Sequence, residues 1–311
     1  MNNKVACVSL NFDSIGHAIG KSPMVDDPTF SIVFNRIREI LDKYNIKISI
    51  FVIGKDLEDH KNSNAVKSWH NDGHEIGNHS YTHPLNFSSL SKEEIYDEIK
   101  KTDEIIFNTI GKKPVGFIAP GWNSSKKVLH SLMKLNYKYD HSLFSSPILL
   151  LGLFKLFYNY LKVRIVEKSP PKTYKLRHIF NRRDFIHMFF GRTKPFQSKK
   201  SYTISNNEPD SIKIFPIPSS YRLSYWLTLE YVFPKKITEF IFNLNTSKKN
   251  FFYILMHPAD FITEEDLKNI DGTQAFERIN ISLDKKLQVF ENRIKQLLEM
   301  GYTFKTFDQL I

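Results

Sequence analysis

The residues best suited to chemistry in this sequence are three histidines that fall within thirteen positions. The stretch 72–84 reads D-G-H-E-I-G-N-H-S-Y-T-H-P and holds His74, His79 and His83. His79 and His83 are four residues apart, so one helical turn after Asn78 would point both imidazoles to the same side of the backbone. Neutral imidazole suits zinc and its first-row neighbours, and a catalytic metal site needs a third protein ligand and one open position. The pair alone is equally typical of surface or capping histidines, so its surroundings must decide.

The elements that must position these histidines alternate between strand and helix in the first half of the chain. Apolar, β-rich runs predict strands at about 4–12, 46–53, 75–77, 115–119 and 137–139. Helical periodicity and capping signals predict helices at about 29–44, 65–69 and 91–110, with a further helix beginning at Ser124 or Ser125. This alternation predicts a parallel sheet or barrel with helices outside it. Asp13, the pair His79 and His83, Pro120 and Asp140 each follow a predicted strand, so we expect them at one rim.

Length and composition fit one large domain, or a domain with a sizeable insertion. The chain has 311 residues, of which 41% are hydrophobic, and this is enough to bury a large core. Cys7 is the only cysteine, which excludes an internal disulfide framework and a cysteine-rich zinc site. The first residues run directly into an apolar strand pattern with no readable export signal, so we expect a cytoplasmic protein.

The strand and helix pattern stops between about 145 and 250, and basic and aromatic residues gather there. The net charge of +11 resides between Lys155 and Lys200, where thirteen Lys and Arg face two acids. Such a segment suits an anionic membrane surface, a lipid-linked substrate or single-stranded nucleic acid, and a solvated insertion folded onto the body is the alternative. We favour a membrane or lipid-linked partner over nucleic acid for 149–200, because Leu149 to Leu161 adds apolar surface. The protein would then be peripheral to the membrane.

No membrane-spanning helix is expected in this apolar stretch. Pro147 to Ile165 carries Lys155, Lys162 and Arg164, so it lacks the roughly 18 uncharged residues that a spanning helix requires. Beyond the insertion the regular pattern returns. We expect a returning strand at 211–218, a buried strand at 251–256 that ends at His257, an amphipathic helix at 282–300 and a last strand at 302–307.

Five motifs in order resemble those of the polysaccharide deacetylases, the NodB-homology group of carbohydrate esterase family 4. G-H-E-I-G-N-H-S-Y-T-H-P at 73–84 is very similar to the family's second motif. L-N-F-D at 10–13 resembles the aspartate-bearing first motif, and G-F-I-A-P-G-W at 116–122 resembles the third. Y-K-Y-D-H-S-L-F at 137–144 resembles the strand that follows, and L-M-H-P at 255–258 resembles the last motif with its histidine. The resemblance covers about 4–144 and 250–311.

The resemblance implies an α/β fold, a distorted (β/α) barrel of the NodB-homology type with fewer than the usual eight strands. Residues 1–311 would form a single domain, interrupted at about 145–250 by the long basic, aromatic-rich insertion. One divalent metal ion, zinc or alternatively cobalt or nickel, would be held by Asp13, His79 and His83. His257 would be the general acid that protonates the departing amine, with an aspartate as the base. The implied substrate is a glycan containing amino sugars, which could be lipid-linked.

The chain departs from the family pattern in its first and third motifs. The family has two carboxylates in the first motif, one the base and one a metal ligand, whereas only Asp13 is present here. In the adjacent register Asp13 is the base and Ser14 stands at the ligand position; in the spaced register Asn11 stands at the base position and Asp13 is the ligand. The arginine that pairs with the base is replaced by Ile118. Loss of both partners of an ion pair together is coherent, because an arginine without its carboxylate would be an unpaired charge, and this favours the spaced register.

Two functions follow from this pattern. The first is an active metal-dependent hydrolase that removes an acetyl or formyl group from an amino sugar, with His17, Asp140 or the metal-activated water in place of the missing base. The second is a catalytically degenerate member that keeps the fold, the metal and the sugar cleft, and acts as a carbohydrate-binding or scaffolding protein. Restoring the missing pair with Asn11→Asp and Ile118→Arg separates them.

Overall fold

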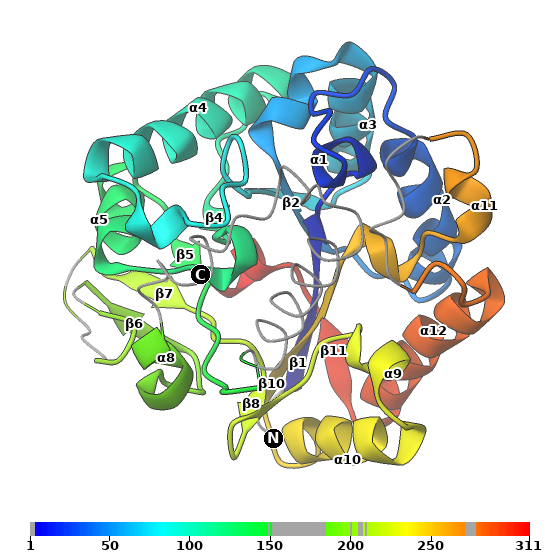
Figure 1. The fold of residues 1–311 in the computed structure, drawn as a ribbon. Coiled ribbons are helices and arrows are strands. Elements are labelled where there is room, and N and C mark those ends of the chain that lie inside the picture. The colour runs from blue at the N-terminus through cyan, green and yellow to red at the C-terminus, as the bar shows by residue number, and fades with distance from the viewer. Residues whose placement is uncertain are drawn as a thin grey trace, which may run out of the picture.

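A curled, mostly parallel sheet forms the centre of the molecule. The computed structural model describes residues 4–148, 150, 185–199, 201–204, 208, 210–270 and 278–311. The strand order is β10-β1-β2-β3-β4-β5-β7-β6, and β11 also pairs with β1. Every neighbouring pair on this path is parallel except β6 and β7, which are antiparallel. Helices surround the curl in Figure 1, so the expected distorted (β/α) barrel is confirmed.

The strands of this sheet are short apart from the first. They are β1 (Lys4–Phe12), β2 (Ser49–Val52), β3 (Glu75–Asn78), β4 (Gly116–Phe117), β5 (Tyr139–Asp140), β6 (Phe196–Ser198), β7 (Ile212–Ile214), β10 (Phe251–Met256) and β11 (Tyr302–Phe304). A separate hairpin is formed by β8 (Ser219–Ser220) and β9 (Leu223–Ser224). The expected returning strand is β7, which joins β5 and so brings the chain back to the sheet.

The helices cover the outside of the curl. They are α1 (Ile15–Ala18), α2 (Pro28–Lys43), α3 (His60–Asn71), α4 (Lys92–Ile110), α5 (Lys126–Lys134), α8 (Phe185–Phe190), α9 (Leu229–Val232), α10 (Lys235–Thr246), α11 (Glu264–Leu267) and α12 (Leu283–Glu299). The expected capping box opens α4, since Ser91 and Glu94 bond each other's backbone N–H, and Gly111 ends the helix with a φ of 72°. Short 3₁₀ turns follow several strands, including Pro120–Trp122 after β4 and Pro258–Asp260 after β10.

The first strand is buried on both faces, as expected for the centre of a parallel sheet. Its even-numbered residues, Ala6, Val8, Leu10 and Phe12, lie in the main core between the sheet and the helices. Its odd-numbered residues point into the barrel, where Cys7 packs with Phe51, Tyr139 and Tyr253. This alternation directs Asn11 and Asp13 inward, toward the axis of the barrel.

Most of the apolar and basic segment predicted as a membrane partner lies outside the described residues, and so does most of 147–165. Within the described part, no helix is both long and apolar enough to cross a bilayer. The described part of the insertion does contribute to the body: β6 and β7 extend the sheet, and α10, which the sequence pattern did not predict, packs against β10.

Candidate functional site

Three side chains with metal-ligating atoms converge at the carboxyl ends of the strands. Asp13 follows β1, and His79 and His83 follow β3. The Oδ1 atom of Asp13 lies 3.3 Å from Nε2 of His79 and 3.4 Å from Nε2 of His83. One ligand atom from each residue lies within 4.8 Å of the others. The rim expected from the sequence therefore brings these three together.

The backbone after β3 does not make the helical turn that the four-residue spacing suggested. Ser80 and His83 adopt positive φ values of 65° and 53°, which interrupt any helix. Asn78 fixes the start of this turn, since its Oδ1 accepts a bond from the Ser80 N–H at 2.8 Å and its Nδ2 donates to Ile99 O at 2.9 Å. The Ser80 hydroxyl then accepts from the His83 N–H at 3.1 Å. The two imidazoles thus meet through a tight polar turn, with ring centroids 4.6 Å apart.

The protonation of His79 makes this arrangement fit a cation. Its Nδ1 lies 2.8 Å from the Ile118 carbonyl oxygen, which can only accept, so Nδ1 carries the proton. In the neutral form of the ring the Nε2 lone pair faces Asp13 Oδ1, a buried oxygen that accepts no hydrogen bond from the described residues. Two acceptors that face each other repel unless a positive charge lies between them. A carboxylate and two imidazoles also suit zinc and related metals, with the Ile118 carbonyl orienting one ring.

The electrostatics of the group favour an ionised Asp13 carboxylate and a neutral His83 imidazole. Burial tends to raise the pKa of Asp13, but His83 and His79 outweigh it and hold the pKa below its ordinary value. Burial lowers the pKa of His83 well below its ordinary value, and the nearby Asp13 only partly offsets this. Neutral imidazole is the form that binds a metal.

Two further histidines border the three ligands. The ring of His17, in α1, lies edge-on to that of His83 with centroids 4.6 Å apart. His257 follows β10 and interacts electrostatically with Asp13. Its ring packs edge-on against Trp122, with centroids 5.9 Å apart. Burial lowers the pKa of both His17 and His257. His257, expected as the general acid, is therefore beside the ligand group, and Trp122 forms a wall next to it.

The first motif favours Asp13 as the ligand rather than Ser14. The Ser14 hydroxyl caps α1 by accepting the His17 N–H at 3.0 Å, and the Ser14 side chain is buried. Asn11 lies inside the barrel, 3% exposed, and its Oδ1 accepts no hydrogen bond within the described part of the chain. Ile118 packs in the inner core. The base position of the spaced register is thus filled by a buried amide, with an apolar side chain at the arginine position.

Asp140 is not brought to this group. Its carboxylate accepts bonds from the Ser142 N–H at 2.8 Å and from the hydroxyls of Ser142 and Tyr202. Tyr139 and His141, on either side of it, both pack in the interior of the barrel against Phe51, so alternation points Asp140 to the outer face. Burial raises the pKa of Asp140 to about 6. The Ser142 hydroxyl also accepts from the Ala119 N–H at 2.7 Å, which connects Asp140 to the segment that carries the Ile118 carbonyl.

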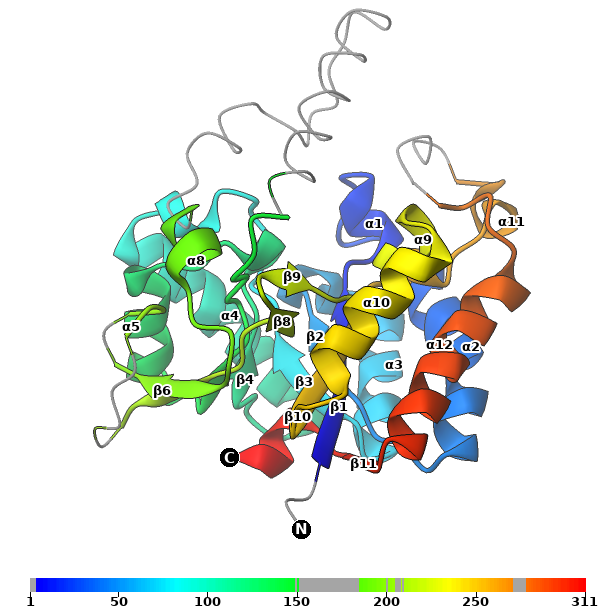
Figure 2. The same cartoon turned by 90° about the horizontal axis from the view of Figure 1, so that it is seen from below.

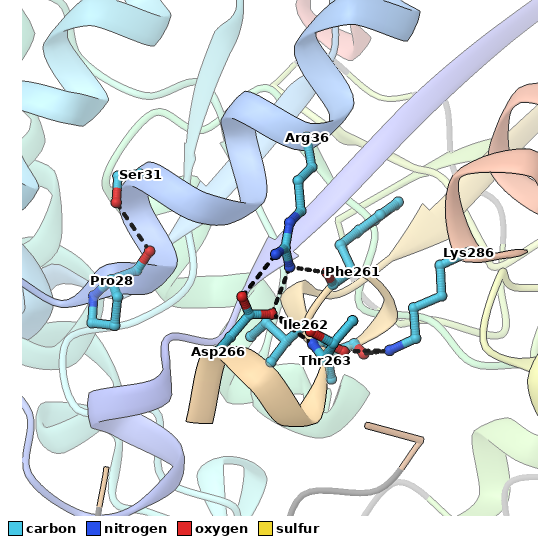
Figure 3. Close-up of polar contacts among 9 residues, drawn as sticks. Pro28, Ser31, Arg36, Phe261, Ile262, Thr263, Asp266 and Lys286 are labelled. Atoms are coloured by element: carbon cyan, nitrogen blue, oxygen red, sulfur yellow. Dashed lines mark hydrogen bonds and ion pairs between the residues drawn. The ribbon is translucent and has the colours of Figure 1, made fainter. Parts of the chain in front are cut away.

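Two cations that sequence reasoning missed hold the segment after His257. Figure 3 shows Arg36 of α2 bonded to both carboxylate oxygens of Asp266, at 2.6 and 2.7 Å, and to the Phe261 carbonyl at 2.7 Å. From the other side, Lys286 of α12 donates to the Ile262 carbonyl, and its Nζ also lies 3.2 Å from the Ala259 oxygen.

The His257 backbone is tied to the same segment. The His257 N–H donates to Asp260 Oδ2 at 3.0 Å. Arg36 lies 225 residues from Phe261, so no spacing in the sequence could predict that hydrogen bond. Lys286 lies 24 residues from Ile262. The contact of Lys286 had one signal in the sequence: this lysine occupies a position of the amphipathic helix α12 that faces the core, where it is buried.

Comparison with known proteins agrees with the motif assignment. The family model described as polysaccharide deacetylase matches residues 2–139. The chain is 34% identical to a peptidoglycan deacetylase of Helicobacter pylori over 108 residues, which are 35% of this chain and 36% of that protein. It is 39% identical to a peptidoglycan-N-acetylglucosamine deacetylase of Bacillus cereus over 85 residues, 27% of this chain and 30% of that protein. The matched segments thus span about a third of these relatives.

A solved structure extends the agreement to the whole fold. A Mycobacterium smegmatis protein assigned to the polysaccharide deacetylases superposes with a TM-score of 0.60 at 14% identity, covering 100% of this chain and 90% of that one. At this identity the likeness concerns the fold alone. It includes the part of the chain beyond residue 139, which the family model does not match.

Proposed function

We propose that this protein is a metal-dependent hydrolase that removes an N-acyl group from an amino sugar of a glycan. The match of residues 2–139 to the polysaccharide deacetylase model and the NodB-type fold support this proposal. The observation that carries the proposal is the convergence of Asp13, His79 and His83 on one point beside His257. The peptidoglycan deacetylases among the relatives support an amino-sugar substrate.

We assign Asp13, His79 and His83 as the ligands of one divalent cation. Their oxygen and nitrogen donors favour zinc, with cobalt or nickel as alternatives. When bound, such a cation polarises the acyl carbonyl and lowers the pKa of a water molecule. The hydrogen bond between Nδ1 of His79 and the Ile118 carbonyl orients the ring and leaves Nε2 free to ligate the cation.

The remaining polar groups have separate roles. We assign His257 as the proton donor to the departing amine, with Trp122 packed against its ring to restrict it. Asn11 cannot accept a proton from water, because an amide is not a base at neutral pH. The ring of His17 lies against that of His83, and we assign His17 as a group able to replace the missing carboxylate. We reassign Asp140 from base to positioning residue, acting through Ser142 on the segment that orients His79.

The substrate we propose is an N-acetylated or N-formylated amino sugar in a polysaccharide or a lipid-linked glycan. Amide hydrolysis needs charge stabilisation at the carbonyl and a proton for the poor leaving group, and the assigned cation and His257 provide these two. A lipid-linked glycan is the finer proposal. It is supported by the excess of basic residues between Lys155 and Lys200, which would attract an anionic lipid surface.

One observation favours a second function. The buried amide of Asn11 and the apolar Ile118 leave the site without the carboxylate and arginine expected of the family. A chain that retains the metal and the cleft but lacks an effective base would bind the glycan without hydrolysing it. The alternative proposal is therefore a degenerate carbohydrate-binding or scaffolding protein.

Acetate release from N-acetylglucosamine oligomers and from peptidoglycan fragments, with zinc added, separates the two. The proposal predicts release by the unaltered protein, and only a small change on Asn11→Asp with Ile118→Arg. An inactive protein that gains activity through this double substitution would identify a disabled site. His83→Ala should abolish release and weaken zinc binding, whereas His130→Ala, which removes an exposed histidine of α5, should alter neither. A fully active His83→Ala variant would refute the ligand assignment.

A further inference from the structure

Large apolar side chains are exposed together on α8 and on the neighbouring β8–β9 hairpin. The exposed residues are Ile186 (58%), Phe189 (45%), Phe190 (70%), Tyr221 (90%) and Leu223 (36%). We refer to these five as the apolar face. Figure 2 shows α8 and the hairpin on the same side of the barrel. A cluster of exposed aromatic and aliphatic side chains indicates an interaction surface more than single exposed residues do.

The helix and the hairpin that carry the apolar face are held in place by contacts with the rest of the fold. On its inner side α8 buries Met188 completely, and His187 Nδ1 lies 3.2 Å from the Ser124 hydroxyl oxygen. Arg222, at the tip of the hairpin, donates to the Met188 and Gly191 carbonyls at 3.2 and 3.4 Å. These contacts attach the hairpin to the helix. The outward direction of Phe189 and Phe190 is therefore set by the packing of the residues around them.

The charge around the apolar face is positive. The stretches 185–199 and 211–229 contain no Asp or Glu. They contain Arg192, Lys194, Lys199, Lys213 and Arg222. Arg192 and Lys194 are exposed and directly follow α8, whereas Lys199 pairs with Glu208 at 3.8 Å. In the sequence this region continues the run of basic residues that begins at Lys155. A surface of this charge selects an anionic partner.

The combination of apolar and basic groups favours an anionic lipid bilayer. Aromatic and aliphatic side chains insert at the boundary of head groups and acyl chains, while Lys and Arg contact anionic lipids. Single-stranded nucleic acid also attracts basic and aromatic residues, but it binds them by stacking on flat rings. Ile186 and Leu223 have no ring to stack, so they add to membrane affinity and add little to nucleic-acid affinity.

We propose that the apolar face docks the protein on an anionic membrane surface, with Phe189 and Phe190 inserted into the head-group region. The inference does not depend on the proposed hydrolase activity. It would also place the candidate site at the bilayer, because α8 packs on Ser124 and near Ser145, which follow β4 and β5 at the rim. Trp122, two residues before Ser124, contacts His257 at that rim.

Flotation with lipid vesicles tests the proposal on the full chain. The protein should bind vesicles of phosphatidylcholine mixed with phosphatidylglycerol, more weakly at high salt, and should bind phosphatidylcholine vesicles far less. Phe189→Ser with Phe190→Ser should reduce binding by about tenfold or more, since each ring contributes apolar burial. Phe107→Ser is the matched control: this ring on α4 is 45% exposed, as Phe189 is, and its loss should change nothing.

A site-specific fluorophore reports insertion directly. Cys7 is the only cysteine and is buried, so Phe190→Cys and Phe107→Cys each create one accessible thiol. An environment-sensitive dye at 190 should shift to shorter wavelength on anionic vesicles, and the dye at 107 should not. Equal binding to neutral vesicles, no binding at all, or an unshifted dye at 190 would each overturn the proposal. Salt-sensitive binding of single-stranded DNA without vesicle binding would assign the surface to nucleic acid instead.

Discussion

The buried ammonium of Lys286 gives the most quantitative prediction, because it couples the segment after His257 to pH. Its side chain is fully buried, and its Nζ is bonded to the Ile262 carbonyl and lies 3.2 Å from the Ala259 oxygen. Burial lowers the pKa of Lys286 from 10.5 to about 8. The charged groups that act on it are Asp260 and Asp266, which raise the pKa, and Arg278 and Arg36, which lower it.

The direction of the pH effect follows from proton binding. Between pH 8 and 10.5 the unfolded chain holds the Lys286 proton while the folded chain has lost it, so folding becomes more favourable as the pH rises. One pKa unit corresponds to about 1.4 kcal/mol. Lys286 should therefore add about 3 kcal/mol to the free energy of unfolding across this interval. Below pH 8 its contribution should be constant.

Urea unfolding of the unaltered protein and of Lys286→Met, repeated from pH 7 to 10.5, measures the contribution of Lys286 to the free energy of unfolding. Other titrating groups contribute equally to both proteins, so the difference between the two curves isolates Lys286. The difference should change by about 3 kcal/mol over the interval. Lys285→Met, which alters the exposed neighbour on the same helix, should give a curve parallel to that of the unaltered protein. If the Lys286→Met curve is parallel as well, burial does not lower the pKa of Lys286 as we infer.

Two further tests, each with a companion substitution, probe the packing around the site. Arg36→Leu removes both bonds to the mostly buried Asp266 carboxylate and should cost about 2 kcal/mol of unfolding free energy at pH 7; the pKa of Asp266 is lowered, so this loss should shrink as the pH falls below 3.8. Arg38→Leu on the same helix breaks a more exposed pair and should cost less than about 1 kcal/mol. Gly77→Ala would place a methyl group 2.4 Å from the Phe51 ring and should cost about 1–3 kcal/mol in urea unfolding, part of which Phe51→Leu should restore.

The sequence was sufficient for the parts of the site that depend on strand ends. Asp13 and His257 each follow a run of apolar residues long enough to recognise, whereas His79 follows the short strand Glu75–Asn78 and was identified by its motif. Parallel strands bring the carboxyl ends of all three strands to one rim. The capping box at Ser91 and the strand at 212–214 were predictable for the same reason, since local residue types determine them. The grouping of Asp13, His79 and His83 was therefore predictable from the resemblance of their motifs to those of a known family, together with the class of fold.

The side-chain directions and the long-range contacts were not predictable in the same way. Asp140 ends a strand of two residues, and the sequence does not show which face of so short a strand is inward. The packing of Tyr139 and His141 against Phe51 places Asp140 on the outer face. The turn between His79 and His83 depends on positive φ values that histidine and serine seldom adopt. Arg36 finds its carbonyl partner 225 residues away, so only the assembled barrel defines that contact.

A crystal structure of the zinc-loaded protein, with the metal located by its anomalous scattering, would show which side chains bind the metal. We predict one zinc ion with Asp13 Oδ1, His79 Nε2 and His83 Nε2 within about 2.0–2.2 Å, and with Asn11 and Ser14 off the metal. A zinc ion ligated by Ser14, with Asp13 standing away from it, would contradict the assignment of Asp13 as a metal ligand. In that case Asp13 would be the base, and the missing carboxylate would be a metal ligand instead.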